Sequence, residues 1–214
     1  GEYSALVAAK SLDLVDALKL VRVRGEAMLQ AGIDNPGTMA AVVGLNKDTI
    51  EECCAEASMD GIVQPANFNS PGQVVISGSV DGVKKGMELC KAAGAKLVKE
   101  LVVSGAFHSP LMESAEERLI EQLNNTVFCD AQIPVYSNVT GLPVTDQEQI
   151  KELLIEQLTF PVRWEEIIVN MIADGAEEFV EVGPGKVLQG LVKRIDPSKK
   201  ISSVDKFSEL EIYL

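Results

Sequence analysis

The order of predicted strands and helices between residues 36 and 100 constrains this fold more than any other feature of the sequence. The stretch contains six patterned segments: a strand at Thr38–Leu45, a helix at Asn46–Ser58, strands at Ile62–Ala66 and Gln73–Ser77, a helix at Val80–Ala93 and a strand at Lys96–Val103. A β-α-β-β-α-β order is typical of a ferredoxin-like unit, which buries one sheet face under two helices. We therefore expect a small ferredoxin-like subdomain over residues 36–103.

The sequence on either side of this unit is mainly helical. Residues 1–9 and 11–32 carry apolar side chains at helical spacing, and the first segment is apolar on most sides, so we expect it to be buried. Later patterns predict helices at Pro110–Asn124, 146–158, 161–174 and Lys186–Ile195, and strands at Ile133–Asn138, Glu178–Val182 and Ile201–Val204. This alternation favours an α/β fold with a parallel, helix-covered sheet. Three strands are few for such a core, so we expect further strands to precede residue 1.

The composition is that of an ordinary globular chain. Hydrophobic residues make up 46% of the 214 residues and charged residues 24%, which argues against disorder. The apolar runs fall far short of the roughly 18 residues that a membrane span needs, and no signal peptide is recognisable. The net charge of −13 has the wrong sign for binding nucleic-acid phosphates or an anionic membrane surface. We therefore expect neither nucleic acid nor membrane as a partner.

The cysteines and the single histidine argue against a metal site. Cys53 and Cys54 are adjacent, Cys90 and Cys129 stand alone, and no CxxC pair is present. Zinc sites need a cluster of such ligands at short spacings. We therefore expect reduced thiols and a cytoplasmic location, with Cys53 and Cys54 acting as packing residues.

His108 is the first candidate for chemistry. It follows the predicted strand Lys96–Val103 and precedes the predicted helix Pro110–Asn124, and sites collect at the carboxyl ends of strands in α/β sheets. A neutral imidazole in that position can act as a general base. A structural histidine is the more common interpretation of His108 taken alone.

Arg24 is the second candidate. Its helical neighbours Leu20, Val21, Ala27 and Met28 are all apolar, so its guanidinium projects from the apolar stripe of its helix. A buried cation needs a carboxylate or phosphate partner. That partner is either an acidic residue of the protein or a ligand.

A third feature is the turn Gly183–Gly185, which lies between a predicted strand and a predicted helix. Backbone N–H groups at such a turn can bind an anion. No Walker spacing or G-x-G-x-x-G motif accompanies it, so a tight turn is the more common explanation. A nucleotide-binding domain is therefore the least favoured function.

Six motifs, in order along nearly the whole chain, resemble those of the malonyl-CoA:acyl carrier protein transacylase family. They are Gly1-Glu2-Tyr3-Ser4-Ala5-Leu6, Asn67-Phe68-Asn69-Ser70-Pro71-Gly72-Gln73, Gly105-Ala106-Phe107-His108-Ser109-Pro110, Ser137-Asn138-Val139-Thr140-Gly141, Pro161-Val162-Arg163-Trp164 and Glu181-Val182-Gly183-Pro184-Gly185-Lys186-Val187-Leu188. The resemblance implies an α/β-hydrolase-like core, here residues 1–35 and 104–214, interrupted by the ferredoxin-like subdomain 36–103. It also implies malonyl transfer for fatty-acid biosynthesis.

The sequence departs from the family pattern at its start. In the family, Gly-His-Ser-Leu-Gly precedes Glu-Tyr-Ser, and its serine is the acyl-carrying nucleophile on a strand-to-helix elbow. Gly1 matches the last glycine of that motif, so the expectation is that the nucleophile lies outside this chain and that the chain alone is inactive. Ser4, Ser104 and Ser109 match other family positions, and none of them is on an elbow.

The resemblance assigns roles to residues of this chain. His108 matches the base that serves both half-reactions, and Gln157 matches the residue whose backbone carbonyl fixes the imidazole tautomer. Arg24 matches the arginine that binds the free malonyl carboxylate and so selects against acetyl groups. Phe107 resembles the bulky residue that disfavours α-branched substrates. Asn67 and Asn69 are expected in a loop over the cleft, either binding substrate or forming the turn.

The partners implied are malonyl-CoA and the phosphopantetheine thiol of acyl carrier protein, with no cofactor and no metal. The main alternative is a non-catalytic module that binds acyl carrier protein or CoA. The absence of a nucleophile from the sequence favours that alternative, whereas the presence of His108, Arg24 and Gln157 together argues against it.

Overall fold

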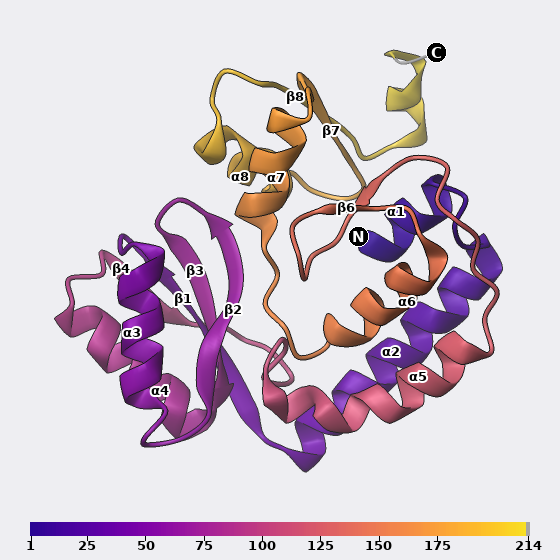
Figure 1. The fold of residues 1–214 in the computed structure, drawn as a ribbon. Helices are drawn as coiled ribbons and strands as arrows, with labels where there is room; N and C mark the ends of the chain where they lie inside the picture. The colour runs from indigo at the N-terminus through magenta and orange to yellow at the C-terminus, as the bar shows by residue number, and fades with distance from the viewer. Residues whose placement is uncertain (213–214) are drawn as a thin grey trace.

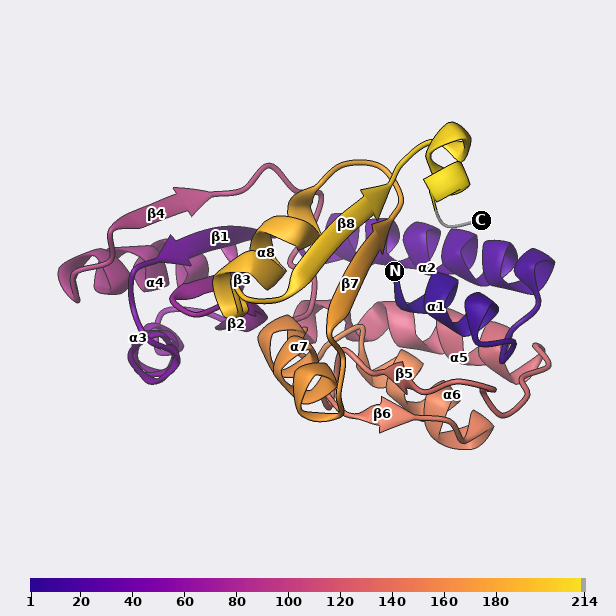
Figure 2. The ribbon, with the colours of Figure 1, turned by 90° about the horizontal axis from the view of Figure 1, so that it is seen from above.

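The structure, a computed structural model, describes residues 1–212. It is an α/β molecule in which a four-stranded sheet with its two helices lies beside a mainly helical region, and the C-terminal strands lie above both (Figure 1). Seen from above, the same parts follow one another along the molecule, with the small sheet at one end and α1 and α2 at the other (Figure 2). The α/β class expected from the sequence is therefore confirmed.

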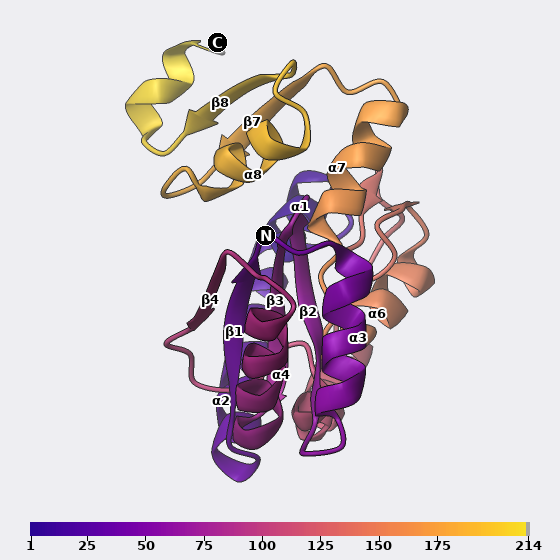
Figure 3. The same cartoon turned by 90° about the vertical axis from the view of Figure 1, so that its left-hand side faces the viewer.

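The four-stranded sheet is antiparallel and has the order β2-β3-β1-β4. Its strands are β1 (Gly37–Val43), β2 (Val63–Ser70), β3 (Gln73–Ser79) and β4 (Leu97–Glu100), and its helices are α3 (Lys47–Ala57) and α4 (Val80–Ala92). Both helices cover the same face of the sheet (Figure 3).

The sequence explains why these elements form and pack. Asn46 and Ser79 cap α3 and α4, because their side chains accept hydrogen bonds from the first-turn amides of Thr49 and Gly82. Between the helices and the sheet lies one apolar cluster: Ala40, Val42, Ile50, Cys53, Cys54, Ala57, Val63, Phe68, Val74, Ile76, Val83 and Cys90. Cys53 and Cys54 are thus packing residues, as expected. None of the four cysteines, all within the described residues, forms a disulfide.

The helical region has a separate core. Its elements are α1 (Glu2–Ala8), α2 (Leu14–Asp34), the 3₁₀ segment η1 (Pro110–Ala115), α5 (Glu116–Asn124) and α6 (Gln147–Glu156). Asp13 caps α2 by accepting from Val15 N at 2.8 Å. Leu6, Leu20, Leu154 and Leu158 are fully buried in the cluster that joins these helices, and each such side chain contributes about 1.5–3 kcal/mol by leaving water.

The C-terminal part contains α7 (Trp164–Ala173), β7 (Glu178–Val182), α8 (Val187–Ile195), β8 (Lys200–Val204) and the 3₁₀ segment η2 (Phe207–Ile212). Strands β7 and β8 pair in parallel. Two further short strands, β5 (Val135–Tyr136) and β6 (Pro143–Val144), form an antiparallel hairpin.

Several predictions about the strands were wrong. The strand expected at Ile133–Asn138 is only the two-residue β5, and it joins a hairpin rather than a parallel sheet. Between named strands of residues 1–212, β7–β8 is the parallel pair, and every other pairing is antiparallel. Alternation of helix and strand along the sequence does not specify which strands pair, so the pattern could not distinguish these arrangements.

Three boundaries also differ from prediction in ways that affect the site. β2 continues through the expected loop as far as Ser70, so the turn is reduced to Pro71-Gly72 and both Asn67 and Asn69 lie in the strand. β4 ends at Glu100, well before His108. The expected helix Pro110–Asn124 divides into η1 and α5.

One face of α2 is exposed although it carries apolar residues. Leu14, Leu18 and Val21 are 59%, 64% and 48% exposed, whereas Ala17, Leu20, Ala27 and Met28 are buried. No element within residues 1–212 covers that face. Within the same residues, no helix is both long enough and apolar enough to span a membrane.

Gly78 provides a test of the small sheet. A Cβ at this position would lie 1.9 Å from the Ile62 carbonyl oxygen, which belongs to rigid backbone. We expect Gly78→Ala to lower the free energy of unfolding by about 3 kcal/mol, the upper end of the usual range for overpacking. Denaturant unfolding followed by circular dichroism measures the change.

Gly190→Ala on α8 is the matched control, because a Cβ there meets nothing within 4 Å. It should stabilise the protein by about 0.5–1 kcal/mol through helix propensity. Equal effects of the two substitutions would contradict the close approach of β3 to Ile62.

Candidate active site

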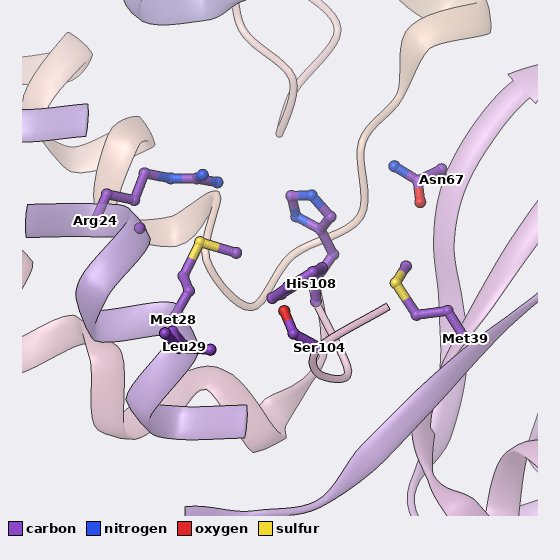
Figure 4. Close-up of a pocket in the computed structure, with 9 residues that line it drawn as sticks. Arg24, Met28, Leu29, Met39, Asn67, Ser104 and His108 are labelled. Carbon is purple, nitrogen blue, oxygen red and sulfur yellow. The ribbon is translucent and has the colours of Figure 1, made fainter. Parts of the chain in front are cut away.

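A cavity of about 440 Å³ lies between α2, the segment after β4, and the sheet strands β1 and β2. Figure 4 shows Arg24 reaching into the cavity from α2 and Asn67 entering it from β2, with His108 between these two side chains. The residues that line it are Arg24, Gly25, Met28, Leu29, Met39, Asn67, Ser104, Phe107 and His108. His108 and Arg24, which are far apart in sequence, thus line the same cavity.

His108 lies in an irregular segment rather than at the end of a strand, which corrects the prediction. Its backbone φ is +58°, in the left-handed region that non-glycine residues rarely adopt. Next to it, the buried Ser109 hydroxyl donates to the Ala106 carbonyl at 2.6 Å. The Ser109 hydroxyl thus has a local backbone partner.

The imidazole of His108 is fixed by Gln157, as the resemblance implies. Nδ1 of His108 lies 2.8 Å from the Gln157 backbone carbonyl oxygen. A carbonyl oxygen can only accept, so Nδ1 carries the hydrogen and the lone pair of the neutral ring is on Nε2. The ring is therefore held in the tautomer that a general base requires.

The surroundings keep this imidazole neutral. Burial lowers the pKa of His108, and the nearby Arg24 charge lowers it further, while hydrogen bonds with the backbone of Gln157 and Phe160 act in the opposite direction. Loss of hydration is the largest of these effects. A base with a lowered pKa is unprotonated at neutral pH and ready to accept a proton.

Only some of the hydrogen-bond donors of Arg24 have a partner within the described residues. Its Nη2 donates to the Gln157 side-chain oxygen at 3.2 Å, and its Nε is buried with no hydrogen-bond partner within the described residues. Burial lowers the pKa of Arg24, although the guanidinium remains charged at neutral pH. A buried guanidinium with spare donors beside a cavity can receive a carboxylate from a ligand.

Glu2 also belongs to the site, and the sequence interpretation missed it. The Gln157 side-chain nitrogen donates to Glu2 Oε2 at 2.5 Å, and the Asn138 backbone N–H donates to the same oxygen at 3.1 Å. Burial raises the pKa of Glu2 despite these bonds. Nothing in local spacing indicates a contact across 155 residues, although Glu2 lies within one of the motifs that carry the resemblance.

Of the other residues expected at the site, two line the cavity and one does not. Phe107 and Asn67 line the cavity, while Asn69 is not among its lining residues even though it lies in the same strand as Asn67.

The turn Gly183–Gly185 does not offer a free helix N-terminus, because the Glu181 carboxylate accepts from the amides of Leu188 and Gln189 at 3.2 and 3.0 Å. An anion at that turn would meet a carboxylate already bound there, so the nucleotide-binding interpretation loses its only support.

Comparison with known proteins shows the family of the chain. The acyl transferase domain family matches residues 1–207. The chain therefore belongs to the acyl transferase family, which confirms the resemblance drawn from the motifs.

Particular members of that family are similar to nearly the whole chain. The malonyl CoA-acyl carrier protein transacylase of Bacillus subtilis is 46% identical over 213 residues, which are 99% of this chain and 67% of the relative. The transacylase of the same name from Staphylococcus aureus strain MRSA252 is 43% identical over 212 residues, which are 99% of this chain and 69% of the relative.

Solved structures show the same similarity. An acyl carrier protein S-malonyltransferase from Vibrio cholerae superposes with a TM-score of 0.95 at 45% identity, covering 100% of this chain and 70% of that chain. A malonyl-transacylase solved in complex with its type II PKS acyl-carrier protein superposes with a TM-score of 0.95 at 40% identity, covering 100% of this chain and 69% of that chain.

The electrostatic coupling of Arg24 and His108 can be tested directly. Replacing Arg24 by Met removes the like charge beside the imidazole, so the pKa of His108 should rise. The protein has one histidine, and NMR titration of its imidazole reports that pKa without ambiguity.

Arg22→Met is the matched control, because Arg22 is exposed and its Nε pairs with Glu26 at 2.9 Å. It should leave the His108 titration unchanged. A His108 pKa that stays constant or falls in Arg24→Met would show that the two groups are not coupled.

Proposed function

We propose that the chain carries the base and the carboxylate-binding residue of an enzyme that moves a malonyl group from malonyl-CoA to the phosphopantetheine thiol of acyl carrier protein, in fatty-acid biosynthesis. One observation carries the proposal. Gln157 contacts His108 through its backbone carbonyl and Arg24 through its side chain, at 2.8 and 3.2 Å. A general base and a cationic receptor are thereby fixed on one cavity.

Proton movement follows from the tautomer. In the first half-reaction a serine hydroxyl gives its proton to Nε2 of His108 and attacks the thioester carbonyl; the C–S bond breaks, and the CoA thiolate takes the proton. In the second, the carrier thiol gives its proton to Nε2 and attacks the acyl-serine ester; the C–O bond breaks, and the serine oxygen regains the proton. The Gln157 carbonyl stabilises the imidazolium formed in each step.

Arg24 supplies selectivity in this proposal. The free malonyl carboxylate would pair with its guanidinium, whose donors are only partly used within the described residues. An acetyl group offers no such carboxylate and would leave the cation without an anionic partner. Phe107 borders the same cavity and would limit branching at the acyl α-carbon, while Asn67 would contact the bound thioester.

The finer features of the fold are part of the proposal. The strand order β2-β3-β1-β4 with α3 and α4 on one face supports a ferredoxin-like subdomain over residues 36–103. Residues 1–35 and 104–214 would then belong to an α/β-hydrolase-like core. The reaction as written uses no cofactor, and the free cysteines support a cytoplasmic location.

The reaction needs a nucleophile beside His108. Within residues 1–212, the imidazole forms hydrogen bonds with backbone groups of Gln157 and Phe160, and the serine that lines the cavity is Ser104. We expect the nucleophile to be the serine of the family's Gly-His-Ser-Leu segment rather than Ser104.

A hybrid that carries the segment preceding the matched region of the Bacillus subtilis relative ahead of Gly1 tests this assignment. Incubated with malonyl-CoA, the hybrid should gain one malonyl group by mass spectrometry, and His108→Ala should slow its formation by about 10²–10⁴-fold. The hybrid that carries Ser104→Ala should gain the malonyl group as readily as the unsubstituted hybrid. Loss of the adduct in Ser104→Ala would make Ser104 the nucleophile, whereas a folded hybrid without any adduct would favour a module that only binds acyl carrier protein or CoA.

The selectivity role of Arg24 is tested in the same hybrid. Arg24→Ala should lower malonyl transfer by about 10- to 100-fold, the value of a hydrogen bond to a charged group, while acetyl transfer should be unchanged or faster. Competition between malonyl-CoA and acetyl-CoA measures the ratio. An unaltered ratio in a folded variant would remove the carboxylate-binding role.

A further inference from the structure

Gln64 connects two segments of the site that no element joins directly. It lies on β2, and its side-chain nitrogen donates to the His108 carbonyl oxygen at 2.9 Å and to the Thr159 carbonyl oxygen at 3.1 Å. These partners are 44 and 95 residues away in sequence. One amide group from the small sheet thus bridges the segment that carries the imidazole and the segment that follows α6.

The chemistry of the amide fixes its orientation. Both partners are carbonyl oxygens, which only accept hydrogen bonds, and a glutamine NH₂ group has two hydrogens to donate. Rotating the amide by 180° would place its oxygen against both carbonyls and lose both bonds. Gln64 therefore holds the two segments only in the orientation observed.

The two segments are those that orient the base. One contains His108, and the other runs from Gln157, whose carbonyl accepts from the imidazole, through Thr159 to Phe160, whose backbone also contacts the ring. β2 holds the second segment by its backbone as well: Val162 N donates to the Ala66 carbonyl and Phe68 N donates to the Val162 carbonyl, both at 2.8 Å.

The backbone of His108 needs such a restraint. A non-glycine residue at a φ of +58° is held against its intrinsic preference, and such conformations persist where the surroundings determine them. The bond from Gln64 falls on the carbonyl of the residue with that conformation. It therefore acts on the torsion angles that direct the imidazole.

We infer that Gln64 is a positioning residue for His108: it bridges the His108 and Thr159 carbonyls and so holds the imidazole Nδ1–H on the Gln157 carbonyl, with Nε2 facing the cavity. The inference rests on the proposed role of His108 as base. It also assigns a function to the contact between the small sheet and the rest of the molecule, because Gln64 belongs to β2 while its partners do not.

The first experiment uses the chain as it is and needs no catalysis. Gln64→Met keeps the length of the side chain and removes both donors, and ¹⁵N NMR of the only imidazole reports its tautomer. The Nδ1–H form should dominate in the parent chain, and the variant should show a mixture with the Nε2–H form. Gln149→Met, at an exposed position on α6, is the control and should retain the parent spectrum.

Gln64→Asn is a second, milder variant, because its amide is one methylene shorter and cannot span both carbonyls. It should shift the tautomer in the same direction while keeping a polar group on β2. An unchanged tautomer in either variant, with circular dichroism showing a folded chain, would overturn the inference whether or not the chain transfers malonyl groups.

Kinetics in the hybrid described above separate positioning from general stability. Gln64→Met should lower kcat for malonyl transfer by about 10-fold and change KM by less than about twofold, because the base is misaligned while the carboxylate site remains. In a His108→Ala background the same substitution should produce no further loss. Multiplicative losses in the double variant would show that Gln64 does not act through His108.

Discussion

The arrangement of the site depends on one buried residue, Gln157, which is 5% exposed. Its backbone carbonyl binds the imidazole of His108, its side-chain oxygen accepts from Arg24, and its side-chain nitrogen donates to Glu2. A buried amide with each group satisfied cannot rotate without losing several bonds at once. The base and the guanidinium are consequently both held by contacts to this one residue, the base by its backbone and the guanidinium by its side chain.

This arrangement sets the charge state of the cavity. A guanidinium and an imidazole face the same space, and two positive charges there would repel each other in a poorly hydrated environment. Burial and the charge on Arg24 lower the pKa of His108, so the site at neutral pH holds one fixed cation and one neutral base. In the proposed reaction the malonyl carboxylate would bind the cation while His108 stays free to accept a proton, so binding and proton transfer would use different residues.

The sequence predicted those features that arise from local patterns. The strand and helix order of the small sheet follows from residue spacing and from turn residues that are close in sequence. Strand pairing is not local, so the β5–β6 hairpin and the full length of β2 were missed. The exposed side of α2 was also missed, since periodicity identifies an apolar face but not whether another element covers it.

The contrast between local patterns and long-range contacts also applies within the site. His108 and Arg24 are candidates on residue type and neighbours, whereas Glu2 and Gln64 join the site through hydrogen bonds to residues far away in sequence. β2 touches the segment after α6 at Ala66 and Phe68 and touches His108 through Gln64. The sheet therefore does more than line the cavity: its edge strand contacts both the backbone of His108 and the segment that follows Gln157.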